Sequence, residues 1–106
     1  MADQINAFHI LLMYAGSERS SATRTKEEAQ AQIADIEKQL RDGADFAALA
    51  REHSDCGSAA AGGDLGAFGR GQMVKAFEAT AFGLDVGGTS GVVETAFGYH
   101  IIHRTG

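Results

Sequence analysis

The chain has 106 residues, a formal net charge of -5 at pH 7 and no proline. A chain of this length can bury a hydrophobic core, so we expect one domain spanning residues 1–106. The acidic balance argues against a general nucleic-acid binder, because such proteins carry a basic patch. The sequence contains neither a long apolar run nor a secretory signal, so no membrane insertion or export is predicted. One cysteine cannot form an internal disulfide, and we expect a cytoplasmic, monomeric protein.

The chain begins with an apolar run of strand length at residues 5–13, INAFHILLM. Because side chains alternate along a strand, His9 should share a face with Ala7, Leu11 and Met13, and should lie inside. Residues 14–24 are polar and lack periodicity, which indicates a surface loop that could touch a substrate.

Two helices are predicted after this loop. Thr25 and Glu28 form a capping box, which marks the start of a long helix, and Gly43 marks its end. Asp45 can cap a second, shorter helix. Both helices should bury one apolar stripe, made of Ala29, Ile33, Ile36 and Leu40 in the first and of Phe46, Leu49 and Ala50 in the second.

The second half of the chain is rich in glycine from residue 57 to residue 71, and a brief strand is expected at 65–68. Residues 73–82 should form a helix with Val74, Phe77 and Ala81 on its inner side and Gly83 as the stop. Strands are expected at 90–95 and 97–104. This order of elements predicts an α+β fold with an antiparallel sheet and covering helices.

Several residues in these elements can carry chemistry, but each also has a structural interpretation. His9 and His100 lie in predicted strands, where a single histidine is most simply a hydrogen-bonded core residue. Cys56 could be a small buried residue, although its polar neighbours place it in a turn where function is common. For the apolar residues Leu65, Met73 and Phe77, spacing alone favours ordinary core packing.

Four motifs occur in the order SDCGSA (54–59), GGDLGAFGRGQM (62–73), AFEATAF (76–82) and FGYHII (97–102). Together they resemble the parvulin family of peptidyl-prolyl cis/trans isomerases. The resemblance implies a parvulin (FKBP-like) fold, in which about four helices surround a four-stranded antiparallel sheet. It also implies an isomerase that rotates Xaa-Pro bonds without a cofactor or a metal.

The resemblance further implies roles for individual residues. The two histidines would form a hydrogen-bonded pair that a threonine hydroxyl joins, with the cysteine beside them at the rim of a proline pocket. The implied catalytic residues are His9, Cys56, Thr95 and His100, and those of the pocket are Leu65, Met73 and Phe77. Gln72 is a weaker candidate for contact with the substrate backbone.

One branch of the family prefers a phosphorylated residue before proline, and residues 54–73 resemble that branch. A phosphate needs two or three charge-assisted donors. Here the first strand ends in Met13, and Glu18 stands beside Arg19, the candidate contact for a phosphate or an acidic residue. Arg24 and Lys26 are further donors. We therefore predict an isomerase without a strict phosphate requirement, acting on proline-containing peptides and on unfolded or flexible protein segments.

The sequence is compatible with three alternative functions. A binding or chaperone module would keep the fold without catalysis, and peptide affinity without rate enhancement would reveal it. Two histidines and a cysteine are chemically adequate zinc ligands, but the sequence lacks CxxC and HxxxH spacing. A cysteine hydrolase would use Cys56 with His100, yet no oxyanion hole is evident. Rotation about an amide needs no covalent bond to the enzyme, which favours the isomerase.

Overall fold

The computed structural model describes residues 4–18, 20 and 22–106. Arg19 lies outside this part of the chain, so its predicted contact stays untested. The elements are β1 (Gln4–Leu12), α1 (Lys26–Arg41), α2 (Phe46–His53), the 3-10 helix η1 (Gly57–Ala61), β2 (Asp64–Gly69), α3 (Lys75–Gly83), β3 (Val93–Thr95) and β4 (Gly98–Arg104). None of the helices in the described residues is long and apolar enough to span a membrane.

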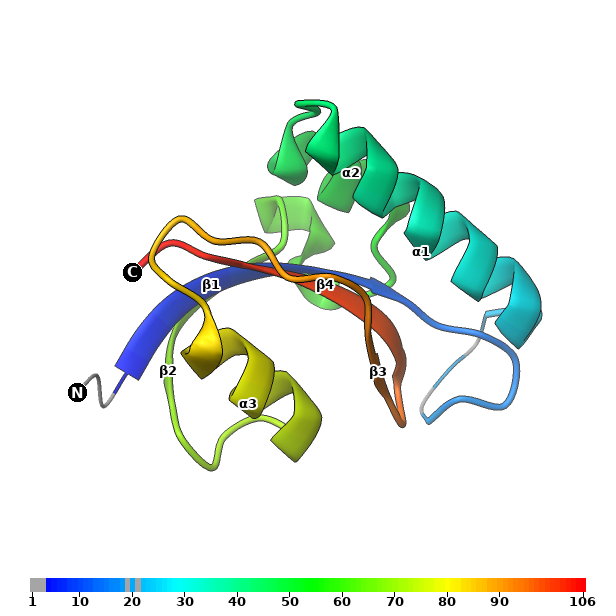
Figure 1. Cartoon of the computed structure of the whole chain (residues 1–106). Helices are drawn as coiled ribbons and strands as arrows, with labels where there is room; N and C mark the ends of the chain where they lie inside the picture. Colours follow the sequence, from blue (N-terminus) through cyan, green and yellow to red (C-terminus); the bar gives the residue numbers. More distant parts are fainter. Residues whose placement is uncertain (1–3, 19, 21) are drawn as a thin grey trace.

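The strands form one four-stranded sheet in the order β2-β1-β4-β3, and every neighbouring pair is antiparallel. Figure 1 shows α1 and α2 on one side of this sheet and the short α3 on the other. The predicted α+β class and the four-stranded antiparallel sheet are therefore confirmed. The described residues contain three α-helices instead of about four, because the alanine-rich segment after Cys56 forms only the short η1.

The two faces of the sheet bury different sets of side chains. The face under α1 and α2 is covered by a cluster that includes Ile10, Leu12, Ile33, Ile36 and Ile101. The face under α3 carries a second cluster that includes Ile5, Ala7, Phe68, Phe77 and Ile102. Alternation along β1 and β4 assigns neighbouring residues to opposite clusters, as the pattern of the first strand predicts.

Both predicted caps on the first two helices are present. Thr25 Oγ1 accepts a hydrogen bond from the Glu28 N–H at 3.1 Å, and Glu28 Oε1 accepts one from the Thr25 N–H at 2.8 Å. Asp45 caps α2 by accepting from the Ala48 N–H at 3.0 Å. The capping box fixes where α1 begins, and Lys26 is its first residue.

The third helix differs from its prediction. It begins at Lys75, and Val74 is an extended cap residue that is 41% exposed, so its predicted place on the inner side is wrong. Gly83 is the last helical residue and not the stop. The third strand is also shorter than predicted, because Ser90 meets β4 through single hydrogen bonds and not through a ladder: its N–H donates to Ile102 O, and its hydroxyl accepts from Ile102 N.

Candidate active site

Two histidines meet on the face under α3 because of the register between the central strands. His9 lies opposite Ile102, and His100 lies opposite Leu11, so the two imidazoles are diagonal neighbours on one face. Their Nδ1 atoms are 3.3 Å apart and hydrogen-bonded. Both side chains are buried, at 5% and 4% exposure. The pairing that the family resemblance implies is therefore present in the structure.

A tight hairpin between β3 and β4 adds a hydroxyl to this pair. Thr95 Oγ1 lies 2.7 Å from His100 Nε2 and also accepts a hydrogen bond from the Phe97 N–H at 3.2 Å. One hydroxyl thus orients the imidazole and closes the turn. Hydrogen bonds connect Thr95 through His100 to His9.

The segment that carries the cysteine is attached to β1 by hydrogen bonds. The Leu11 N–H donates to Ser54 Oγ at 3.0 Å, and the Asp55 N–H donates to Leu11 O at 2.7 Å. Two residues before Leu11 in β1, the His9 N–H donates to Gly63 O at 2.9 Å. Gly63 must be glycine, because its φ is +89° and a Cβ there would lie 2.4 Å from the His9 carbonyl oxygen. These bonds hold Cys56 beside the histidine pair.

The pKa values of two polar groups of the site, Cys56 and His100, are lowered. His9 and, to a smaller extent, Ser58 together lower the pKa of Cys56 to about 6, against the opposing effect of partial burial. His9 Nε2 is buried and has no other hydrogen-bond partner among the described residues, which leaves this nitrogen available to the Cys56 sulfur. Burial, with a smaller effect of His9, lowers the pKa of His100 to about 3. Near neutral pH, Cys56 is therefore largely a thiolate and His100 is neutral.

A cavity of about 320 Å³ opens beside these groups. Its walls are His9, Leu11, Cys56, Leu65, Gln72, Met73, Val74, Phe77, Phe97 and His100. Phe77 packs edge-on against both imidazoles, with ring centroids 5.4 Å from His9 and 5.3 Å from His100. Apolar side chains, the Cys56 sulfur and the two imidazoles therefore line the same cavity.

The structure places every described site candidate in or next to this cavity. Thr95 is joined to it through His100. Gln72 lines it while its Oε1 accepts from the Gly69 N–H at 2.7 Å, so this side chain also holds a turn. The sequence reasoning missed Leu11, Val74 and Phe97. Alternation from His9 identifies Leu11, and Phe97 begins the FGYHII motif, but no local signal marked Val74 as a wall.

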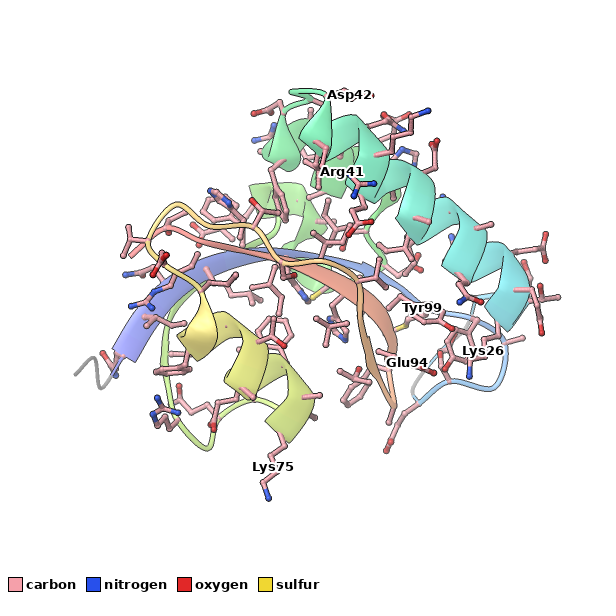
Figure 2. The ribbon with its side chains drawn as sticks, viewed as in Figure 1. Lys26, Arg41, Asp42, Lys75, Glu94 and Tyr99 are labelled. Carbon is pink, nitrogen blue, oxygen red and sulfur yellow. The ribbon has the colours of Figure 1, made fainter. Side chains whose placement is uncertain are left out.

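Two cations at the start of α1, Arg24 in the preceding loop and Lys26 in the helix, are already paired with carboxylates. Arg24 Nη1 donates to Met13 O at 2.9 Å and forms an ion pair with Asp55. Lys26 Nζ lies 3.0 Å from Glu94 Oε2, and Figure 2 shows these two side chains together beside Tyr99. Arg24 and Lys26 are therefore engaged within the chain.

Another cation has a packing role. Arg70, which precedes the Gln72–Met73 pair, lies over the Phe82 ring at 4.3 Å from its centroid. Among the residues that the structure describes, no group of three or more His, Cys, Asp and Glu side chains lies close enough to hold a metal ion.

Comparison with known proteins gives a consistent result. The rotamase family, the PPIC-type PPIASE domain, matches residues 9–106. The peptidyl-prolyl cis-trans isomerase Pin1 of Digitalis lanata is 43% identical, with 99% of this chain and 98% of that protein covered. Pin1 of Arabidopsis thaliana is 44% identical over 97% of this chain and 96% of its own length. The solution structure of TbPIN1 superimposes with a TM-score of 0.90 at 36% identity, covering 100% of both chains.

Proposed function

Because the chain belongs to the parvulin family of PPIC-type isomerases and is a Pin1-like peptidyl-prolyl cis-trans isomerase, we propose that the cavity under α3 is where it rotates the Xaa-Pro bond. The observation that supports this site is that apolar side chains, the Cys56 sulfur and two imidazoles line one cavity. The proline ring would lie among Leu65, Met73 and Phe77. The bond before the ring would then face Cys56 and the histidines.

This arrangement suits amide rotation. The planar amide is held by resonance, which places partial negative charge on its oxygen and sets a barrier of about 18–20 kcal/mol. A dry cavity disfavours this charge-separated planar form relative to the twisted form. A gain of about four decades in rate requires roughly 5–6 kcal/mol of such differential stabilisation. A few preorganised contacts can supply that amount.

The polar residues have distinct roles in this proposal. The Cys56 thiolate disfavours negative charge on the carbonyl oxygen and so weakens the double-bond character of the amide. His9 holds the thiolate form, and the neutral His100 has one nitrogen that donates and one that accepts. Thr95 is a positioning residue, since it reaches the substrate only through His100. No bond to the carbonyl forms, and a trapped thioester on Cys56 would contradict this mechanism.

We further propose that the isomerase has no strict phosphate requirement. The support is that Arg24 and Lys26 are each paired with a carboxylate of the chain. The test is cis/trans exchange measured by NMR on matched Ser-Pro, Glu-Pro and phosphoserine-Pro peptides. Catalysis of all of them is expected. Strong selectivity for the phosphopeptide would contradict the phosphate proposal, and no acceleration of any peptide would contradict the site.

The remaining expectations about context are also proposals. The net charge of -5 supports action without nucleic acid, and the single cysteine agrees with a reducing, cytoplasmic setting. Clients would be flexible, proline-containing segments of other proteins, reached by a monomeric domain spanning residues 1–106. Sedimentation of the purified chain would test the monomeric state.

A further inference from the structure

The loop at residues 70–74, between β2 and α3, supplies three neighbouring walls of the cavity. Gln72, Met73 and Val74 lie in this loop, and all three line the cavity. Figure 1 shows the loop at the bottom of the molecule, where the chain turns from β2 into α3. Because a loop lacks the repeated hydrogen bonds of a helix or a strand, the position of these walls depends on a few individual contacts.

One residue in the first turn of α3 binds this loop at two points. The Glu78 N–H donates to Val74 O at 2.9 Å, and Glu78 Oε1 accepts from the Gly71 N–H. Gln72 and Met73 lie between the two bonded residues. Glu78 therefore closes the loop around the two walls, with its backbone at one end and its carboxylate at the other.

Two other contacts hold the beginning of the loop. Gln72 is bonded to the end of β2, and the Arg70 guanidinium lies over the Phe82 ring. Both contacts fix residues that precede Met73. The bonds of Glu78 differ from them, because they reach the loop on both sides of Met73.

We propose that Glu78 is a positioning residue of the site, whose carboxylate holds the loop so that Met73 stays against the proline ring. The inference rests on the proposed function, which places the ring among Leu65, Met73 and Phe77. Phe77 is buried and belongs to α3, whereas Met73 is only partly buried and belongs to the loop. Without the bond from Gly71 to Glu78, Met73 can move away from Phe77 and widen the pocket.

The expected kinetic effect follows from what the pocket binds. The proline ring itself does not change when the amide before it rotates, so its contacts stabilise the ground state and the transition state equally. Losing such a uniform contact raises KM and leaves kcat unchanged. Loss of Glu78 should therefore affect KM, since Cys56 and the histidines that face the rotating bond keep their own attachments.

The test separates the acceptor from the charge. Glu78→Ala removes the acceptor, whereas Glu78→Gln keeps an amide oxygen, and both variants lose the charge but keep the backbone bond to Val74. NMR exchange rates over a range of Ser-Pro peptide concentrations give KM and kcat. Glu78→Ala should raise KM about tenfold, the effect of losing one hydrogen bond to a charged group, with kcat within about twofold. Glu78→Gln should raise KM by no more than about threefold.

A second readout does not depend on activity. Met73 packs against the cluster that contains Phe68 and Phe77, so the rings shift its methyl signal in the free protein. In Glu78→Ala this signal should move toward that of an exposed methionine. In Glu78→Gln it should stay near its wild-type position.

Glu52→Ala is the matched control. Glu52 also lies on a helix, but on α2, on the other side of the sheet from α3 (Figure 1), where its carboxylate is 3.7 Å from His53. The variant removes the same charge, and it should keep KM within about twofold of wild type and leave the Met73 signal in place. Circular dichroism shows whether each variant folds. If Glu78→Ala does not, Glu78→Leu takes its place, because leucine fills more of the space without offering an acceptor.

The outcomes distinguish this inference from the proposed function. A wild-type KM in Glu78→Ala, an equal rise in Glu78→Ala and Glu78→Gln, or an unmoved Met73 signal in Glu78→Ala would overturn the role of Glu78. A wild-type chain that accelerates no peptide would contradict the proposed site instead. In that case the Met73 signals of the two variants still decide whether Glu78 positions the loop.

Discussion

The two faces of the central sheet are built from the same strands but serve different purposes. Under α1 and α2, Ile10 and Ile101 are fully buried in an aliphatic cluster. Under α3, their chain neighbours His9 and His100 are buried as well, but they border a cavity with a half-buried thiol. Because side chains alternate along the strands, residues that stabilise the core and residues of the candidate site occupy adjacent positions in the chain. One face buries an aliphatic cluster, while the other holds the cavity that the two histidines and the cysteine line.

The largest expected effect is on the aliphatic face. Ile36→Ala removes a side chain that is 1% exposed in the α1 cluster, and loss of burial together with the cavity left behind should cost about 2–5 kcal/mol of unfolding free energy. Denaturant unfolding measures this. Under native conditions the folded fraction should retain its isomerase activity, because Ile36 faces away from the cavity. If the folded fraction lost activity, the proposal that the α1 face contributes stability and the α3 face contributes catalysis would be wrong.

The thiolate provides the next largest effect. Cys56→Ala should lower kcat/KM about 100-fold, the size of losing one preorganised electrostatic group. Cys56→Asp restores a negative charge at that position and should recover activity to within about tenfold of wild type. NMR exchange on a Ser-Pro peptide measures both. Equal losses in the two variants would mean that charge is not what Cys56 contributes.

Removing the Thr95 hydroxyl, which is bonded to His100, should lower kcat/KM by less than the loss of the cysteine does. Thr95→Val keeps the shape but removes the partner of His100 Nε2 and of the Phe97 N–H, so kcat/KM should fall about tenfold and stability by about 1–2 kcal/mol. Thr80→Val is the control, since that hydroxyl donates only to Ala76 O on α3. If kcat/KM fell equally in both variants, the proposed positioning role would be wrong.

The pH dependence should be the mildest and most specific effect. Activity should rise as Cys56 ionises, with an apparent pKa of about 6, and this step should disappear in Cys56→Asp. Because the folded pKa lies below the usual value, folding also gains stability from this group at high pH and loses it as pH falls through about 6. Alkylation rates measured against pH report the thiol directly. A thiol pKa near its ordinary value would contradict the proposed effect of His9 on Cys56.

The aliphatic face was largely predictable from local pattern. The helical period of residues 29–40, the capping box at Thr25 and the alternation in the first strand each depend on neighbouring residues. The start of α3 was not predictable in this way, because Val74 makes no side-chain cap hydrogen bond that would mark it. As a result Val74 was assigned to the core, whereas it lines the cavity.

The face under α3 was less predictable, because its site is formed by contacts between segments that are distant in the sequence. Family resemblance named His9 and His100, but their contact requires the register between β1 and β4, which links residues 91 positions apart. The pairing of Arg24 with Asp55 spans 31 positions and left no local pattern. Ser54 and Asp55 were recognised as polar turn residues, while their attachment to β1 became visible only in three dimensions.

The most direct test of the account locates the proline ring on one of the two faces. Methyl-labelled protein can be mixed with an exchanging Ser-Pro peptide, and nuclear Overhauser contacts from the ring protons can be assigned. Contacts are expected to the methyl groups of Leu65 and Met73 under α3, and none to Leu40, which borders a second cavity on the α1 face. Ring contacts to Leu40, with Leu65 and Met73 unaffected, would contradict it.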